Sequence, residues 1–249
     1  MHEPIPVKDL AFGLWPVIEA LKADKDVNKI ILQKGLQSEQ LPELMKLVKE
    51  KEIPFQWVPI EKLNKITRKN HQGVVAFLSP VTFQNIESIL PSLYEQGKIP
   101  LIIVLDGVTD VRNFGAICRT SLCMGVNAIL IPDKGSALIN ADALKTSAGA
   151  IHSLPICRVP NLKTSLQYLK DSGLKIVAVT EKASKDLHKI SFIEPLVLLM
   201  GSEDIGISEA YMKMADENIK ISIEGNIQSL NVSVAAGIVL YECQRQRNS

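Results

Sequence analysis

Short apolar runs alternate with amphipathic stretches along most of this 249-residue chain. Apolar runs bounded by turn residues predict buried strands, and apolar residues spaced three or four apart predict helices. In the N-terminal region the pattern predicts helix 15–21, strand 29–32, helix 38–51, strand 55–58, helix 60–68 and strand 74–78. This alternation indicates a small α/β domain over residues 1–78.

Residues 79–98 form a predicted linker that prolines and a glycine interrupt. Within it only residues 86–93 have a helical pattern. We therefore expect the domain boundary in this linker and a second domain over residues 99–249.

The second domain has longer apolar runs and a regular alternation. Its predicted elements are strand 101–105, helix 114–124, strand 128–131, strand 154–159, helix 162–170, strand 175–179, strand 196–200, helix 207–215, strand 219–223 and helix 232–245. Apolar strands that alternate with helices predict a mainly parallel sheet covered on both faces. Ligands of such sheets bind beyond the carboxyl ends of the strands, so the loops at 106–113, 180–181, 201–206 and 224–231 are the candidate binding region.

Composition places the chain among ordinary globular proteins. Hydrophobic residues make up 46% and charged residues 22%, and no apolar run approaches the roughly 18 residues that a membrane span needs. The N-terminus lacks the segments of a secretory signal, so we expect a cytoplasmic location and no membrane partner. The cysteines and histidines lack zinc-ligand spacing, which argues against a metal and against a disulfide framework.

The net charge of +1 does not by itself indicate a nucleic-acid binder. A polyanion partner would need a local patch, and the best candidate is the basic group, defined as Lys62, Lys65, Arg68, Lys69 and His71. By charge alone, a solvated helix end is the more common explanation of such a group.

Two polar residues belong to the predicted helix 114–124. Asn113 has a side chain that can cap the helix, and Arg119 lies inside it among apolar neighbours. A buried arginine needs an ionic partner, so a structural salt bridge is one explanation of Arg119. The other explanation is a cation directed at a phosphate or at an oxyanion that develops during a reaction.

The segment from Gly201 to Gly206 follows an apolar strand directly. Its glycines allow the backbone to approach a ligand closely, but it matches neither the dinucleotide fingerprint nor the phosphate-binding loop. Glu203 and Asp204 favour a ligand that carries a cation or hydrogen-bond donors over a pyrophosphate. A plain tight turn is the alternative interpretation.

The segment from Gly225 to Tyr241 starts with small polar residues and continues as an apolar helix. Ser229 and Asn231 stand where the helix begins, and both residue types cap helices, so a capped core helix is the simplest interpretation. We expect the start of this segment to lie beside the loop at 201–206. Backbone groups there are suited to hold an adenine ring between three apolar side chains: Met200, Ile221 and Leu230.

Three segments in this order resemble a known family. NFGAICRT at 113–120, MGSEDIGIS at 200–208 and IQSLNVSVAAG at 227–237 resemble the motifs of the SpoU (TrmH-like) branch of the SPOUT RNA methyltransferases. The N-terminal region resembles the ribosomal-protein-like substrate-binding domain of the bacterial 23S rRNA guanosine 2′-O-methyltransferases, through HQGV at 71–74 and FGxxPV at 12–17.

The resemblance implies a fold, a reaction and partners. The C-terminal domain would be a trefoil-knotted α/β domain whose last helix passes through the knot, and the protein would be a homodimer with its active site near the subunit interface. Its cofactor would be S-adenosylmethionine. The reaction would be methyl transfer to a ribose 2′-hydroxyl of RNA, with a guanosine of 23S rRNA as the target.

The resemblance also assigns roles to residues of this chain. Arg119 would act at the hydroxyl, and we favour stabilisation of the alkoxide or binding of the RNA phosphate because guanidinium is too weak a base. Asn113 would orient Arg119 or the ribose, and Glu203 would position Arg119 or the methionine amine. Ser229 and Asn231 would shape the cofactor loop. Contacts with the cofactor would come from Thr180, Gly201, Ile221 and Leu230, and the basic group would bind RNA phosphates.

Three alternatives remain. A non-catalytic RNA-binding protein of this fold would have lost part of the candidate site, which is intact here. A nucleotide-dependent oxidoreductase would carry the dinucleotide fingerprint, which is missing. Among the methyltransferases, transfer RNA is the second candidate substrate, and the separate N-terminal domain favours ribosomal RNA.

Overall fold

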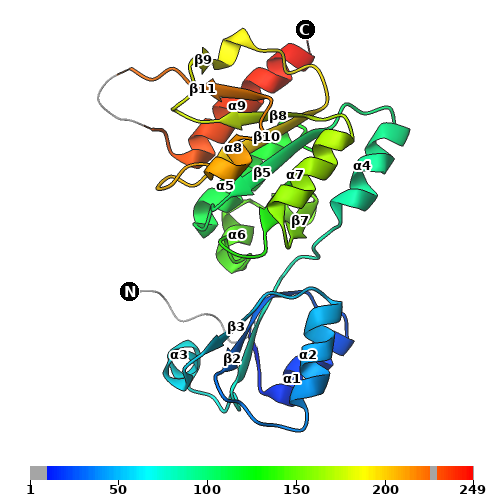
Figure 1. Cartoon of the computed structure of the whole chain (residues 1–249), viewed down its shortest axis with the longest axis vertical. Helices are drawn as coiled ribbons and strands as arrows, with labels where there is room; N and C mark the ends of the chain where they lie inside the picture. Colours follow the sequence, from blue (N-terminus) through cyan, green and yellow to red (C-terminus); the bar gives the residue numbers. More distant parts are fainter. Residues whose placement is uncertain (1–9, 225–228, 249) are drawn as a thin grey trace. The chain divides into compact units, whose positions relative to one another are not determined.

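The computed structural model of the protein describes residues 10–224 and 229–248. The chain separates into two compact units (Figure 1). The first unit comprises residues up to Thr82 together with Leu138–Asn140, and the second comprises Phe83–Ala137 and the chain from Ala141 onwards. None of the helices in these described ranges has the length and apolar character needed to cross a membrane.

The first unit is built on a four-stranded sheet with the order β1-β4-β2-β3. Strand β4 runs antiparallel to β1 and β2, whereas β3 runs parallel to β2. The elements are β1 (Leu10–Phe12), α1 (Leu14–Lys22), β2 (Val27–Gln33), α2 (Leu41–Glu50), β3 (Phe55–Val58), α3 (Ile60–Ile66) and β4 (Val74–Leu78).

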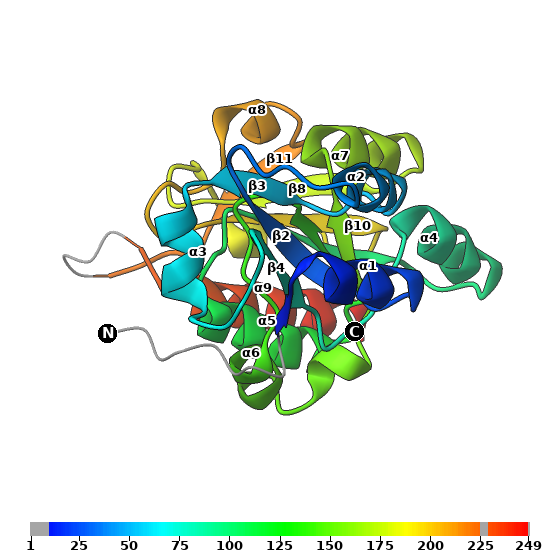
Figure 2. The ribbon, with the colours of Figure 1, turned by 90° about the horizontal axis from the view of Figure 1, so that it is seen from below.

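The two faces of this small sheet are covered by different helices (Figure 2). Helices α1 and α2 cover one face, where Ile18 and Leu44 pack with Ile30 of β2 in a continuous apolar core. Helix α3 covers the other face and contributes Leu63 to a smaller apolar cluster around Phe77. The second face therefore carries less apolar packing than the first.

The second unit is built on a seven-stranded sheet with the order β7-β6-β5-β10-β8-β11-β9. Every neighbouring pair in this sheet is parallel, which confirms the predicted α/β class with a mainly parallel sheet. The elements are α4 (Ile86–Glu95), β5 (Leu101–Asp106), α5 (Val111–Cys123), β6 (Ala128–Pro132), α6 (Ala141–Thr146), β7 (Ile156–Val159), α7 (Leu162–Asp171), β8 (Lys175–Val179), β9 (Lys185–Asp186), β10 (Leu196–Gly201), α8 (Glu209–Met212), β11 (Glu217–Lys220) and α9 (Val232–Arg247).

Helices cover both faces of the large sheet (Figure 1). Leu90 of α4 and Leu166 of α7 pack against the β strands in one apolar core. Helices α5 and α9 lie on the opposite face, where Phe114 and Val239 are fully buried. Because both faces are buried, β10 is apolar from Leu196 to Met200 and β5 from Leu101 to Leu105, as the sequence pattern predicts.

Helices α5 and α9 lie side by side and run in the same direction. Asn113 near the start of α5 meets Asn231 at the start of α9, where Asn231 Nδ2 donates to Asn113 Oδ1 at 3.0 Å. Two turns further along, a Cβ atom on Gly237 would lie 3.8 Å from Thr120 Cγ2. This is an ordinary van der Waals distance, so the two helices pack together here as well as at their N-terminal ends.

The far end of α9 is fixed by Arg247. Its guanidinium donates to four backbone carbonyls, at 2.9 Å to Phe192 and Ile99, 2.8 Å to Glu194 and 3.3 Å to Pro100. These carbonyls lie just before β5 and β10, the two strands at the centre of the sheet. Helix α9 is therefore held at both ends.

Several predicted elements need correction. Strands β1 and β9 and helix α6 were not predicted, because elements of two to six residues show no clear periodicity. The helix expected over 207–215 is limited to α8, since 3₁₀-type bonds from Met214 N to Tyr211 O and from Ala215 N to Met212 O turn the chain away. Strand β11 ends at Lys220, so Ile221 lies beyond the strand rather than within it.

Candidate active site

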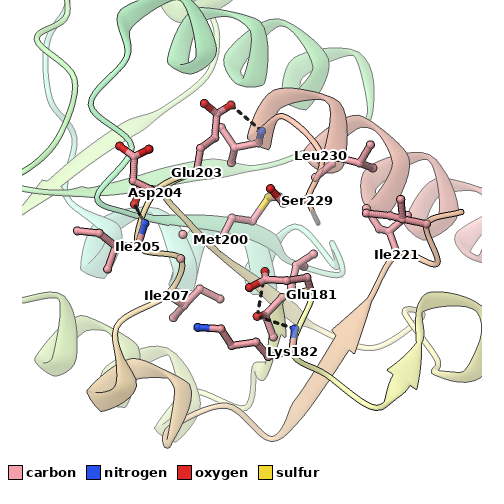
Figure 3. A pocket seen from close by; sticks show the side chains of 18 residues that line it. Glu181, Lys182, Met200, Glu203, Asp204, Ile205, Ile207, Ile221, Ser229 and Leu230 are labelled. Atoms are coloured by element: carbon pink, nitrogen blue, oxygen red, sulfur yellow. Dashed lines mark hydrogen bonds between the residues drawn. The ribbon is translucent and has the colours of Figure 1, made fainter. Parts of the chain in front are cut away.

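A cavity of about 330 Å³ opens beyond the carboxyl ends of β8 and β10 (Figure 3). The segments after β8, β10 and β11 line it together with the first turn of α9. Its apolar lining includes Val179, Met200, Ile207, Ile221, Leu230 and Val232. Its charged lining consists of Glu181, Lys182, Glu203 and Asp204. This combination suits a ligand with a flat apolar part and a polar or cationic part.

The loop between Gly201 and Gly206 doubles back on itself. Gly206 N donates to Ser202 O at 2.9 Å, and Gly206 adopts a left-handed φ of 75°. A Cβ atom on Gly201 would lie only 2.1 Å from the carbonyl carbon of Gly206, so a larger residue is excluded there. The tight turn and the ligand-lining loop are thus the same structure, and the two interpretations of this segment are compatible.

Glu203 joins the three motif segments. Its Oε1 accepts hydrogen bonds from Asn113 Nδ2 at 3.2 Å, from Val232 N at 3.1 Å and from Asn231 Nδ2. The bond from Val232 N places the carboxylate at the N-terminus of α9, where the helix dipole favours negative charge. The prediction that the loop at 201–206 lies beside the start of the last helix is therefore confirmed.

The helix caps differ from the sequence prediction at one of two positions. Asn231 caps α9 as expected, since its Oδ1 accepts from Ser233 N at 3.0 Å and Val234 N at 3.3 Å. The expectation that Asn113 caps α5 is wrong. The cap is Asp110, which accepts from Asn113 N at 2.8 Å, and the Asn113 side chain is thereby left to bond with Glu203.

Arg119 lies on the exposed side of α5, two turns from the Glu203 contacts. It does not line the cavity, and within residues 10–224 and 229–248 it forms no ion pair. The structural salt bridge considered for Arg119 is thus not present in the described part of the chain. Its guanidinium is available to an external anion.

The four residues expected to contact the cofactor line one cavity: Thr180, Gly201, Ile221 and Leu230. Ser229 also lines it, two residues before the cap of α9. Thr180 follows β8 and is 8% exposed, and its backbone N–H donates to Ile219 O at 2.8 Å. This bond joins the end of β8 to β11 and fixes the direction in which the next residues leave the sheet.

Glu181 and Lys182 line the cavity but were not predicted as site residues. The loop at 180–181 follows a predicted strand, and a charged pair directly after that strand is the signal that could have identified both. Thr180 Oγ1 lies 3.4 Å from Glu181 Oε2 and accepts from Lys182 N at 3.3 Å. The threonine hydroxyl therefore holds the turn that carries these two charges.

The basic group divides into exposed cations and a buried histidine. Lys62, Lys65, Arg68 and Lys69 are exposed on and after α3. His71 is 7% exposed, with Nε2 2.9 Å from Asn64 Oδ1 and Nδ1 accepting from Gly73 N at 3.0 Å. With both ring nitrogens engaged, His71 shapes the loop before β4, and we revise its expected role as a phosphate contact.

Lys29 is a further cation of the first unit that the sequence did not single out. It lies half-buried on β2, with Nζ 5.0 Å from the centroid of the Phe77 ring. Burial and the nearby charge of Lys62 lower the pKa of Lys29. Lys69 makes a similar contact, with Nζ 5.5 Å from the Phe12 ring centroid. Lys29 of strand β2 thus lies near the cations on and after α3, since the charge of Lys62 acts on it.

Comparisons with known proteins cover both units. The SpoU rRNA Methylase family model matches residues 100–241, and a model described as RNA 2′-O ribose methyltransferase substrate binding matches residues 10–84. A protein of Staphylococcus saprophyticus named as a TrmH family tRNA/rRNA methyltransferase is 34% identical over 95% of both chains. A Bacillus subtilis protein with the same family name is 32% identical over 96% of both chains.

Solved structures agree with these matches. An AdoMet-bound rRNA methyltransferase from Sinorhizobium meliloti is 25% identical and superposes with a TM-score of 0.61 over 95% of this chain and 86% of its own. The TrmH/SpoU tRNA modifying enzyme of A. aeolicus is 36% identical with a TM-score of 0.56, over 65% of this chain and 84% of its own.

Proposed function

The chain belongs to the SpoU methylase family of S-adenosylmethionine-dependent RNA methyltransferases, and from this premise we propose that it methylates the ribose 2′-hydroxyl of a guanosine in 23S rRNA. The observation that carries the proposal is the Glu203 carboxylate. It joins Asn113, Asn231 and the start of α9 at the rim of the cavity, so the three motif segments form one site.

The cavity fits the cofactor by its chemistry. Apolar side chains such as Met200 and Leu230 suit the two faces of an adenine ring, and backbone groups of the loop at 201–206 suit its polar edge. The carboxylates of the lining suit the cationic methionine end. When bound, S-adenosylmethionine supplies an electrophilic methyl group, so the chain has to position the ribose and stabilise its oxygen as the proton leaves.

Arg119 is the residue we place at the ribose. Its exposed guanidinium can donate to the developing alkoxide or hold the adjacent phosphate, and either interaction is strongest when the negative charge is largest. Asn113 and Glu203 act on Arg119 indirectly, because they fix the start of α5 against the start of α9. This assigns Glu203 to the positioning of helices rather than to a direct bond with Arg119.

The basic group is the surface that we propose for RNA binding. On the opposite face of the first unit, lysines of α1 and α2 pair with acids, as in Lys22–Glu43 at 2.9 Å and Lys46–Glu50 at 3.7 Å. In contrast, Lys62, Lys65, Arg68 and Lys69 form no ion pair with any residue that the structure describes. Unpaired cations release counterions when phosphates replace them, which favours binding of a polyanion.

Two observations favour ribosomal RNA over transfer RNA. The chain carries the substrate-binding region at residues 10–84, and the rRNA methyltransferase of S. meliloti matches 95% of the chain. The tRNA modifying enzyme of A. aeolicus matches only 65% of it. Transfer RNA is the second candidate, because the relatives in Staphylococcus and Bacillus are named for both RNA classes.

A homodimer in the cytoplasm, with a knotted catalytic domain, completes the proposal. On α9 the exposed apolar residues Val234, Ile238 and Tyr241 recur at helical spacing, with exposures of 51%, 37% and 61%. Leu122 on α5 is 40% exposed and shares a helix side with Arg119. A second copy of the chain on this surface would bury the apolar side chains and place its edge beside Arg119.

The substrate is tested by mapping ribose 2′-O-methylation in ribosomal and transfer RNA from a strain that lacks this gene. We expect one guanosine of 23S rRNA to lose its methyl group and to regain it when the purified enzyme and S-adenosylmethionine are added. Loss of methylation confined to transfer RNA would overturn the choice of ribosomal RNA.

The homodimer is tested by analytical ultracentrifugation of Ile238→Asp. We expect a dimer for the unmodified protein and a monomer for the variant, because a buried charge opposes association. Trp15→Glu serves as the control, since it alters an exposed apolar residue of the first unit. A monomeric unmodified protein would overturn the dimer.

A further inference from the structure

We propose that Glu181 makes the cavity prefer the cationic methyl donor over its product, which has no net charge, and so helps the donor to replace the product after each reaction. This inference rests on the proposed function, since it concerns the cofactor of the same site. It assigns a specificity role to a residue that lies outside the three motif segments at 113–120, 200–208 and 227–237.

The position of Glu181 directs its carboxylate into the cavity. The residue directly follows Thr180, which is buried at the end of β8 and tied to β11 through Ile219 O. Figure 3 shows the Glu181 carboxylate projecting from this turn toward the space below Met200 and Ser229. Because the turn is anchored to two strands, the backbone that carries this exposed side chain has a fixed location relative to the cavity.

Glu181 has more acceptor capacity to spare than Glu203, which lines the same cavity. Glu203 Oε1 already accepts from two asparagine amides and one backbone N–H. Glu181 Oε2 has one contact among the described residues, with Thr180 Oγ1 at the long distance of 3.4 Å. A carboxylate accepts up to about four hydrogen bonds, so most of its capacity remains for a ligand.

The other charges of the lining do not cancel this one. Lys182 lies next in the chain, but it forms no ion pair with Glu181 or with any other described residue. In Figure 3 its ammonium lies on the Ile207 side, away from the Glu181 carboxylate. Asp204 stands at the outer end of its loop, and its carboxylate points away from Glu181. Glu181 is therefore the acid whose charge faces the interior.

The reaction changes the charge of the ligand that Glu181 faces. The bond between sulfur and the methyl carbon breaks and its electron pair stays on sulfur. The methyl carbon bonds to the 2′-oxygen, and the hydroxyl proton leaves to solvent or to the RNA phosphate. The sulfonium thereby becomes a neutral thioether, so the ligand loses its net positive charge. A nearby carboxylate attracts the donor and has no such attraction for the product.

The test compares binding of S-adenosylmethionine and S-adenosylhomocysteine by isothermal titration calorimetry with full-length protein. For Glu181→Gln, which keeps the size and polarity of the side chain, we expect about fivefold weaker binding of the donor and less than about twofold change for the product at low salt. For Lys182→Met, which removes a positive charge, we expect the affinity for the donor to rise relative to the affinity for the product. High salt should reduce both differences.

The matched control is Glu95→Gln at the exposed end of α4, which removes the same charge away from the cavity. It should leave both affinities unchanged. Equal weakening of the two ligands in Glu181→Gln would indicate packing or hydrogen bonding and would overturn the inference, as would no change in either. If the unmodified protein bound neither ligand, the cofactor assignment itself would fail, and this inference with it.

Discussion

The cofactor cavity and the basic group differ in the sign of their charges and in how the charged side chains are held. In the cavity, three donors hold the Glu203 carboxylate in one position, and the Glu181 carboxylate projects from a turn whose backbone is anchored to two strands. In the basic group, Lys62 and Lys65 are long, exposed side chains without ionic partners among the described residues. The difference matches the proposed ligands. A small cation is recognised through the position of the carboxylates around it, and a polyanion through the number of cationic side chains that face it.

The largest effect is expected from a residue that acts in methyl transfer itself rather than in binding the cofactor or the RNA. Arg119→Ala should reduce the rate of methyl transfer by roughly 10²–10³-fold, because one donor to a developing oxyanion has about this value. Affinities for the cofactor and for RNA should change by less than about threefold, since Arg119 lies outside the cavity and in the other unit from the basic group. Single-turnover transfer of a labelled methyl group measures the rate.

Arg119→Lys separates charge from geometry. A lysine keeps the positive charge but lacks the planar set of donors, so we expect it to restore only a small part of the rate. Transfer at the unmodified rate in Arg119→Ala would remove this residue from the chemistry.

The next effect tests the basic group as a set. Replacing Lys62, Lys65, Arg68 and Lys69 with glutamine should weaken RNA binding by about 10–100-fold at moderate salt. The slope of log affinity against log salt should fall by about 0.7–0.9 for each phosphate that the variant no longer neutralises. Fluorescence anisotropy with a labelled rRNA fragment at several salt concentrations gives both quantities.

The control for the basic group lies on the opposite face of the same unit. Glutamine at Lys22, Lys46, Lys49 and Lys51 removes the same formal charge. Several of these lysines already pair with acids, so their replacement should affect RNA binding less. Equal effects of the two sets would mean that total charge, and not the α3 surface, determines RNA binding.

A smaller effect is expected from Glu203→Gln. Glutamine keeps an acceptor for Val232 N but loses the charge that the N-terminus of α9 favours, and its amide now faces the amides of Asn113 and Asn231. We expect roughly tenfold weaker binding of S-adenosylmethionine with RNA binding unchanged. Glu203→Ala should weaken cofactor binding further, and a smaller loss for alanine than for glutamine would contradict the charge argument.

The smallest effect should come from Lys29→Met, which we expect to weaken RNA binding by about two- to fivefold. Burial and Lys62 lower the pKa of Lys29, so its charge is lost at a lower pH than that of an ordinary lysine. The difference between the variant and the unmodified protein should therefore shrink with increasing pH. A pH series of anisotropy titrations checks this, and a constant difference would assign Lys29 a packing role.

The long apolar strands of the second unit could be predicted from the sequence, because both faces of the sheet are buried and the runs are unbroken. The location of the ligand region followed from the same pattern, since parallel strands bring their carboxyl ends to one edge. Shorter elements could not be predicted. Strand β1 exists because it pairs with β4, and α6 packs so closely on Gly115 that a Cβ atom there would lie 2.8 Å from Thr146 Cβ.

The residues of the site could be predicted from the sequence better than the contacts that they make. Gly201, Thr180, Ile221 and Leu230 line one cavity, as the motifs and strand ends indicated. That Asp110, rather than Asn113, caps α5 depends on where the helix begins, which a sequence specifies only to within a few residues. The burial of His71 and the exposure of Arg119 depend on tertiary packing that single-residue chemistry does not determine.

Helix α9, held at its start by Glu203 and at its end by Arg247, has a consequence for the order of synthesis. A ribosome delivers the first unit and the strands of the large sheet before it delivers this helix. Domains fold as they emerge, but the cavity lacks Leu230 and Val232 until the last segment is in place. A growing chain can thus become compact long before it can hold its cofactor, and cofactor binding then stabilises only the completed protein.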